Sequence, residues 1–362
     1  MTNGCIASRY NGPHPLALNI LTLSQRERVL PLCGLRESPS PSGRRGQLTG
    51  QRMRAVVLWI FVIGHLTLLL ALPSLAAGQA GTDIAVLEAG VGARALGMGG
   101  AFTAIADNAD APYWNPAGLG LVSSSEITTM QTKLSTDADH YYVSFVQPAL
   151  GGTLGFSWIQ VGLGNITQTS GEVNNNNEVQ NLGTFSYFSN AYLIAYGKNL
   201  NDHISVGLTG KYLTSDMSGI GGGQASGYSV TPGLLLRLST VHDSLFTIGL
   251  KLDDAINQQQ WGTGTDENVP PKLRLGLAYR SPNPGTFAVD ISQTMRSNYS
   301  PDVAAGYEWA DKFLSFRFGY AADGLTAGAG FTIDHARVDY AYVNQTALSR
   351  DNVHRVSLSG IW

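Results

Sequence analysis

The chain has 362 residues, of which 43% are hydrophobic and 14% are charged, with a net charge of -3 and a pI near 6.1. Mild acidity leaves no basic surface for nucleic acid, and no long apolar run follows residue 80, which argues against a helical membrane protein. The two cysteines, Cys5 and Cys33, precede the folded part expected below, so disulfides and thiol chemistry are excluded from it.

The first 80 residues are expected to lie outside the folded protein. Residues 1–52 are rich in Arg, Pro and Ser and show no periodicity, which predicts disorder. A basic start at Met53-Arg54, an apolar run over 55–72 and small residues up to residue 80 predict a secretory signal peptide over 53–80. The alternative for this run is a membrane anchor, because it is long enough to span. We interpret Met53 as the true start and residues 1–52 as an artefact of start assignment.

Residues 81–123 are dense in glycine and alanine, which predicts a compact segment able to fold inside a barrel mouth as a hatch. Phe102 to Ala111 is expected to form about two helical turns, and Asn115-Pro116-Ala117-Gly118 is expected to form a sharp turn. The sequence around Gly97 to Gly100 is not a phosphate loop, because it lacks a preceding strand and the Lys-Ser/Thr pair. The candidate hatch residues are Gly92, Arg94, Gly97, Gly99, Gly100, Asp107, Trp114, Asn115, Pro116, Ala117 and Gly118.

From residue 124 to residue 362 the chain alternates between two faces. In Leu325 to Ile333, for example, every odd-numbered residue is apolar and every even-numbered residue is small or polar, which is the period of a strand with two different faces. Turn signals divide this region into about fourteen segments of roughly 9 to 15 residues, long enough to cross a bilayer at a tilt. The segments lie near 125–134, 139–149, 151–162, 184–198, 202–215, 226–239, 243–254, 271–281, 285–294, 301–310, 312–321, 324–333, 335–345 and 352–362.

The connections between these segments alternate in length. Tight ones are expected around Leu150, Asn201-Asp202, Val241-His242, 282–284, Asp311 and Asp334. Long polar ones are expected at 163–183, 215–225 and 255–270. Short turns at one end and long loops at the other are typical of outer-membrane barrels, whereas a soluble β-sandwich has no reason for this asymmetry. We therefore expect an all-β fold, a transmembrane antiparallel barrel of about fourteen strands with an N-terminal hatch, in the outer membrane of a Gram-negative bacterium.

The end of the chain supports this location. Val356, Leu358 and Trp362 alternate along the last strand and are expected to form the signal read by the barrel-assembly machinery, although His354 and Gly360 interrupt the pattern.

If the apolar stripe faces lipid, several cations point into the lumen. An inward excess of basic residues would suit a carboxylate ligand, but these cations equally suit water or acidic partners on neighbouring strands. The same two alternatives apply to Arg94: contact with a substrate, or an ion pair that anchors the hatch to the wall. The lumen candidates are Lys211, Lys251, Lys272, Arg274, Arg280, Arg317, Arg337 and Arg355.

Nothing in the sequence indicates an enzyme, a metal site or a cofactor. The histidines downstream of residue 80 fall in no nucleophile motif and show no paired spacing for zinc. Asp266-Glu267 alone supplies too few oxygen ligands for calcium.

The stretch Gly92 to Leu119 reads Gly-Ala-Arg-Ala-x-Gly-Met-Gly-Gly-Ala-Phe-Thr-Ala and later Trp-Asn-Pro-Ala-Gly-Leu, and it resembles the N-terminal signature of the PorV/PorQ family in the FadL-like class of outer-membrane transporters. The resemblance implies a hatch carrying the Asn-Pro-Ala turn, followed by a fourteen-stranded barrel. FadL-like proteins carry hydrophobic compounds, including long-chain fatty acids, across the outer membrane.

PorV-like proteins instead bind exported proteins in type IX secretion. The motif does not distinguish these roles, because fold does not imply function. We favour uptake of a hydrophobic small molecule, with secretion as the alternative. The expected partners are the lipid bilayer, the barrel-assembly machinery, the small-molecule ligand and, in the alternative, secreted proteins.

Overall fold

The computed structural model describes residues 85–134, 137–173, 176–239, 244–296, 299–322, 324–344 and 352–362. The expected extension at 1–52, the expected signal peptide at 53–80 and the expected turn at Val241-His242 lie outside these described residues. None of the helices within them is long and apolar enough to cross a membrane.

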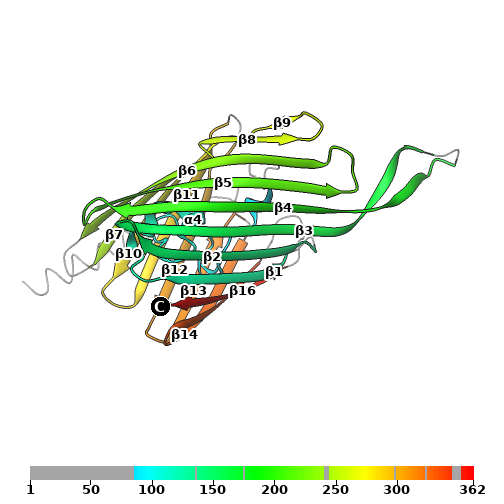
Figure 1. Ribbon diagram of the computed structural model, residues 1–362. Helices are drawn as coiled ribbons and strands as arrows, with labels where there is room; N and C mark the ends of the chain where they lie inside the picture. The colour runs from blue at the N-terminus through cyan, green and yellow to red at the C-terminus, as the bar shows by residue number, and fades with distance from the viewer. Residues whose placement is uncertain are drawn as a thin grey trace, which may run out of the picture. The chain divides into compact units, whose positions relative to one another are not determined.

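Fourteen of the described strands form a closed antiparallel barrel, as predicted (Figure 1). Each strand pairs with its neighbours in chain order, β1 pairs with β16, and a short hairpin of β8 (Ile256–Trp261) and β9 (Asp266–Glu267) is added to the outer part of β6. The barrel strands are β1 (Glu126–Lys133), β2 (Asp139–Ala149), β3 (Gly152–Val173), β4 (Val179–Asn199), β5 (Ile204–Ser218), β6 (Gln224–Ser239), β7 (Leu245–Asp253), β10 (Lys272–Ser281), β11 (Gly285–Thr294), β12 (Asp302–Ala310), β13 (Leu314–Ala321), β14 (Gly324–Ile333), β15 (Ala336–Val343) and β16 (Val353–Ile361).

The two faces of these strands differ as the alternation predicts. Outward positions carry large apolar side chains that remain exposed, such as Phe318 at 62% and Leu325 at 63%, whereas their inward neighbours Arg317 and Thr326 are buried. A soluble protein rarely exposes apolar side chains over so much of its surface, and lipid is the solvent in which such a wall is stable. The outer face is therefore the membrane-facing side of the barrel.

Tight turns join the strands at one end. Leu150 and Gly151 have φ values of 56° and 73°, and Asp334 has a φ of 48°, which suits two-residue hairpin turns that follow the twist of the strands. The predicted turns at 282–284 and Asp311 are short as well, with three residues each. At the same end, Ser125 and Trp362 exchange backbone hydrogen bonds of 3.0 Å, which closes the seam between the first and last strands.

At the other end the structure corrects the predicted loops, and the one expected at 215–225 shortens to residues 219–223 between β5 and β6. Residues 163–183 are mostly a continuation of β3 and β4, a two-stranded ribbon that extends past its neighbours in Figure 1, and 255–270 contains the β8–β9 hairpin. Both faces of the ribbon are largely exposed, so neither face had to be apolar and the two-residue hydrophobic period disappears from the sequence.

Inside the barrel lies the hatch, here residues 85–122, with α2 (Ala85–Glu88), α3 (Ala93–Gly97), α4 (Ala111–Trp114) and the 3₁₀ helix η1 (Pro116–Leu121). Its apolar residues are buried and form the core together with inward side chains of the wall. The helix predicted over Phe102 to Ala111 was wrong, because only its last residue is helical. The carbonyl of Thr103, which a helix would bond to the N–H of residue 107, instead accepts from the side chain of Asn115 at 2.8 Å.

Candidate functional site

The wall of the lumen presents glycines to the hatch. A Cβ at Gly207 would overlap the backbone of Pro116, and a Cβ at Gly249 would overlap the carbonyl of Thr103. Several of these glycines face each other across neighbouring strands, which brings whole stretches of wall backbone against hatch backbone. The wall glycines in contact with the hatch are Gly155, Gly197, Gly207, Gly233, Gly249, Gly276, Gly306, Gly319 and Gly328.

The Asn-Pro-Ala-Gly turn is the centre of this contact. Asn115 is fully buried; its Oδ1 accepts the Ala117 N–H at 3.1 Å, and its Nδ2 donates to the carbonyl of Thr103 and, at 3.3 Å, to that of Leu234 on β6. Pro116 and Ala117 lie against Gly207, and a Cβ at Gly118 would overlap the carbonyl of Ala106. The turn therefore fixes the hatch fold and attaches it to the wall.

The remaining motif residues also shape the hatch. Gly92, Gly99 and Gly100 have φ values of 76°, 68° and 77°, the left-handed region that favours glycine, and Gly97 lies against Gly328. Trp114 packs inside the hatch rather than against the barrel: its ring meets Phe102 edge-on at 6.0 Å, and its Nε1 donates to the carbonyl of Val91 at 3.0 Å. These contacts assign the motif a folding role.

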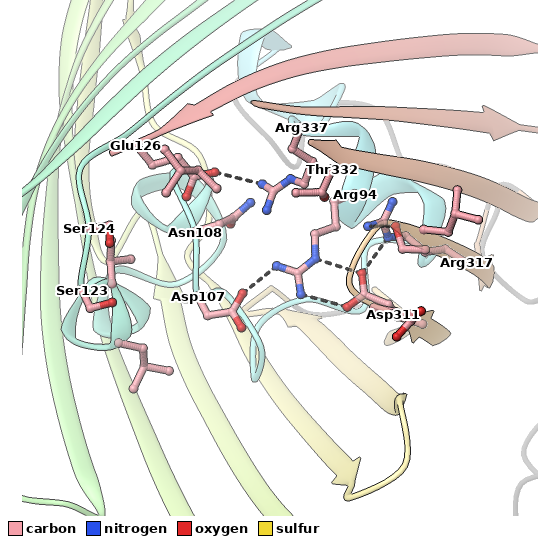
Figure 2. Close-up of a pocket in the computed structure, with 17 residues that line it drawn as sticks. Arg94, Asp107, Asn108, Ser123, Ser124, Glu126, Asp311, Arg317, Thr332 and Arg337 are labelled. Atoms are coloured by element: carbon pink, nitrogen blue, oxygen red, sulfur yellow. Dashed lines mark hydrogen bonds and ion pairs between the residues drawn. The ribbon is translucent and has the colours of Figure 1, made fainter. Parts of the chain in front are cut away.

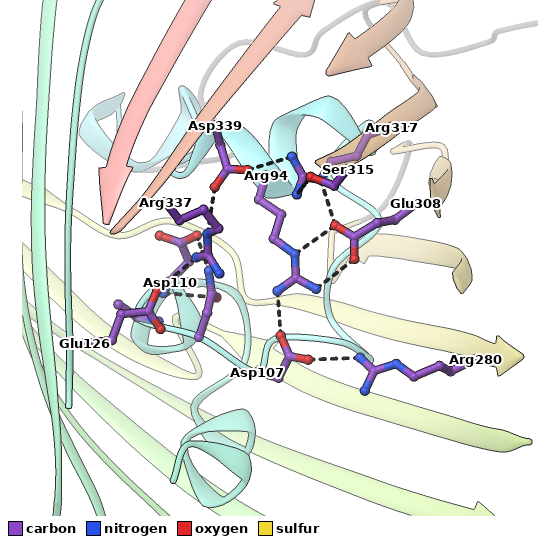
Figure 3. A network of polar contacts seen from close by, with 12 residues as sticks. Arg94, Asp107, Asp110, Glu126, Arg280, Glu308, Ser315, Arg317, Arg337 and Asp339 are labelled. Atoms are coloured by element: carbon purple, nitrogen blue, oxygen red, sulfur yellow. Dashed lines mark hydrogen bonds and ion pairs between the residues drawn. The ribbon is translucent and has the colours of Figure 1, made fainter. Parts of the chain in front are cut away.

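A chain of ion pairs joins the hatch to the wall; we call it the latch network (Figure 3). Arg94 of the hatch binds Glu308 of β12 through two hydrogen bonds of 2.9 Å and binds Asp107 at 2.6 Å. Of the two alternatives for Arg94, the structure thus shows the anchoring ion pair. In order, the network runs Arg280, Asp107, Arg94, Glu308, Arg317, Asp339, Arg337 and Glu126, so four arginines alternate with four carboxylates.

Asp107 and Asp110 of the hatch experience opposite environments. Burial by itself raises the pKa of Asp107, but Arg94 and Arg280 outweigh this effect and hold the pKa below its usual range. Asp110 has no such pair of arginines, and burial raises its pKa despite a hydrogen bond from Asn108. Asp107 is therefore the hatch carboxylate whose charge the network stabilises.

A second charged cluster lies on β5, β7 and β10, beside α4. Asp253 binds Lys251 at 2.5 Å and Arg274 at 2.6 Å, and Lys211 binds Asp254 at 2.8 Å. Lys251 also donates to the carbonyl of Tyr113 in the hatch at 2.5 Å. Three cations thus share two carboxylates next to the hatch.

The structure places all eight lumen candidates on the inner face of the barrel. Lys272 is buried and lies opposite Asp253 in the strand register, and Arg355 donates to the carbonyl of Ala89 at 2.8 Å. The other six belong to the latch network or the second cluster. The structure therefore supports acidic partners and hatch carbonyls for these cations, and their binding of a ligand stays a prediction.

At the chain end, Val356, Leu358 and Trp362 point outward, and Trp362 stacks on Phe145. Their role in assembly also stays a prediction.

Two hollows lie at the tight-turn end of the barrel, and Asp107 lines both. One, of about 350 Å³, is lined by latch residues including Arg94, Glu308 and Arg337 (Figure 2). The other, of about 450 Å³, is lined by Ile105, Leu245, Arg280 and Arg237. Sequence reasoning missed Arg237, because Leu234, Leu235 and Leu236 precede it and hide the alternation that would have placed it inside.

No protein-family model and no curated protein matches this chain. Among solved structures, the crystal structure of the P. putida toluene transporter TodX matches with a TM-score of 0.50 and 14% identity over 75% of this chain and 99% of that one. The TodX deltaS2S3 mutant monoaromatic hydrocarbon channel gives 0.52 and 14%, over 75% and 97%. At this identity the matches show a shared barrel fold.

Replacing Gly207 by Val should destabilise the folded barrel by about 1–3 kcal/mol, because the new side chain must displace the backbone of Pro116. Gly210 on the same strand is the matched control, since a Cβ there would meet only the carbonyl oxygen of Ile194 at 4.0 Å. Thermal unfolding followed by the heat-dependent gel shift of purified barrel measures both. Equal midpoints for Gly207→Val and Gly210→Val would contradict the packing.

Replacing Arg94 by Gln should loosen the hatch, because removing one member of a buried ion pair costs about 3–5 kcal/mol. Hydrogen exchange of the peptides covering 94–107 should accelerate in the purified barrel, while the exposed control Lys312→Gln leaves it unchanged. Adding Glu308→Gln to Arg94→Gln should recover part of the protection, since it removes a buried carboxylate that has lost one of its two arginines. Unchanged exchange in Arg94→Gln would show that glycine packing alone holds the hatch.

Acid should loosen the same segment. Because the pKa of Asp107 is depressed in the fold, its contribution is present above its unfolded pKa of about 3.9 and is lost as pH falls through the lower folded value. Exchange over 94–107, corrected for the intrinsic rate, should therefore rise below about pH 4. The Asp107→Asn variant should lack this acid step; an identical step in both would assign it to other carboxylates.

Proposed function

We propose that this protein is an outer-membrane barrel of the FadL-like kind that takes up hydrophobic small molecules. The observation that carries the proposal is a lipid-facing barrel whose lumen is filled by a folded hatch. A lumen filled in this way is unsuited to a permanent aqueous pore, because hatch backbone packs directly against the wall glycines. The shared fold with a protein described as a toluene transporter supports the same class of cargo.

The inner wall of the barrel combines apolar residues with a charged cluster, and both suit such a cargo. On β1 to β5 the inward side chains include buried apolar residues, among them Met130, Ile159 and Leu193, which belong to the same apolar core as Val86 and Leu87 of the hatch. The second charged cluster lies on β5, β7 and β10. An apolar wall beside a cluster of three cations and two carboxylates suits an apolar molecule with an acidic head group, because the cluster has one positive charge in excess. We therefore propose long-chain fatty acids as one cargo.

One observation favours the alternative role in type IX secretion. The β3–β4 ribbon extends beyond the wall and exposes Val179 and Leu182. Exposed apolar residues on a paired ribbon suit a protein partner. In this alternative, exported proteins bind the ribbon and the barrel serves as an anchor.

Native mass spectrometry of the barrel, purified from its own outer membrane in mild detergent, tests the proposal. We expect a co-purifying apolar small molecule that is lost in Leu193→Asn, because an amide on the inner wall disfavours an apolar ligand. The matched control is Leu150→Asn in an exposed turn. An empty barrel that instead carries a second polypeptide would overturn the uptake proposal.

Shortening the ribbon separates the two functions. Replacing residues 167–184 by Asn-Gly, a sequence suited to a two-residue turn, joins Ile166 to Phe185, which are already paired across the ribbon. Uptake requires the lumen and the hatch, so the co-purifying molecule should be retained. If neither the full chain nor the shortened chain carries a small molecule, and if shortening removes a bound polypeptide, the result would support the secretion role.

A further inference from the structure

The 450 Å³ hollow at the tight-turn end contains an arginine with unused hydrogen-bonding capacity. Arg237 of β6 lines it, and its buried Nε has no hydrogen-bond partner. Its guanidinium donates one long bond, of 3.4 Å, to the carbonyl of Asn201. Within the described ranges no carboxylate lies in ion-pair distance of Arg237, unlike the arginines of the latch network. A buried charged donor without an acceptor is costly, and it indicates a ligand that supplies one.

A second arginine lines the same hollow. Arg280 of β10 binds Asp107 at 2.9 Å, and its side chain is 47% exposed, so part of its guanidinium remains accessible. Thr247 on the intervening strand β7 lies opposite both Arg237 and Ala278, and Arg280 follows Ala278 by two residues on the same inner face. The two arginines therefore flank one space from strands on either side of β7.

Charge and lining define what fits this space. The latch network carries equal numbers of arginines and carboxylates, so Arg237 adds a positive charge that the network does not balance. The lining also contains Asp107, which is paired with Arg280, and its other residues are apolar or uncharged, among them Ile105 and Leu121 of the hatch and Leu245 and Ala278 of the wall. A ligand with a negatively charged head group and an apolar body matches both properties.

We infer that this hollow is a binding site for an amphiphilic anion, with a carboxylate or phosphate monoester held by Arg237 and Arg280 and an apolar body against Ile105 and Leu245. The forked donors of arginine match either head group. The volume lies within the range of about 300–1,000 Å³ common for small-molecule sites. The inference rests on the proposed function in one respect: a cargo taken up through the barrel would reach this site after it passes the hatch.

Calorimetric titration of the detergent-purified full chain at low ionic strength tests the site with hexanoate, hexyl phosphate, inorganic phosphate and 1-hexanol. We expect hexanoate or hexyl phosphate to bind and hexanol not to bind. Arg237→Gln should weaken binding at least tenfold, and Arg237→Lys should weaken it less, because the charge remains without the fork. The exposed Arg296→Gln, outside the hollow, should have no effect.

Equal binding by the native chain and Arg237→Gln, or equal binding of hexanol and hexanoate, would overturn the inference. Inorganic phosphate binding as tightly as hexyl phosphate would also overturn it, because the apolar body would then contribute nothing. If Arg237→Gln does not fold, Leu245→Asp introduces a carboxylate into the hollow with Arg237 in place, and it should abolish binding. A barrel that retains its co-purifying apolar molecule but binds no amphiphilic anion would contradict this site and leave the uptake proposal intact.

Discussion

The approach of hatch backbone to wall backbone is the constraint on which the rest of this structure depends. Because glycines occupy the inner positions that face the hatch, no side chain separates Pro116 from Gly207 or Thr103 from Gly249, and the lumen has no space for a second layer. Backbone groups brought this close must satisfy their hydrogen bonds locally. Asn115 does so for the turn, and Asp290 of β11 accepts the N–H groups of Phe102 and Thr103 at 3.0 and 2.9 Å. The hatch and the inner wall therefore form one core.

The same closeness removes water from the charged side chains of the lumen, so each buried charge needs a partner. The latch network meets this need by alternating signs from Arg280 to Glu126, with hatch and wall both contributing. Any movement of the hatch that separates Arg94 from Glu308 leaves a buried carboxylate with one arginine fewer. Movement of the whole hatch is thus costly, and a cargo that passes must either compensate for the lost ion pairs or leave them intact.

The barrel could be predicted from sequence because lipid imposes a repeating pattern: lipid-facing positions are mostly apolar, and fourteen segments with alternating turns follow from it. Features that depend on contacts inside the barrel were harder to predict. The helix expected at Phe102 failed because Asn115, which follows the expected helix, binds the Thr103 carbonyl that the helix needed. The pairing of the lumen cations depends on the strand register and on the position of the hatch. The alternation of apolar and polar residues predicts neither. Arg237 was missed because three leucines before it conceal the phase of its strand.

The hatch contacts the wall differently along its length. Residues from Arg94 to Leu119 contact the wall glycines and the latch network, whereas α2 brings the apolar side chains of Val86 and Leu87 to the wall of β3 and β4. Polar contacts near α2 include those of Tyr113, which donates to the carbonyl of Leu87 at 2.5 Å, and of Arg355, which donates to that of Ala89. Apolar contacts are not directional, and an apolar molecule replaces them at little cost. Displacement of α2 would expose the apolar wall while Arg94 and its partners stay in place. The apolar face of α2 is therefore the part of the hatch that an apolar molecule is best able to replace.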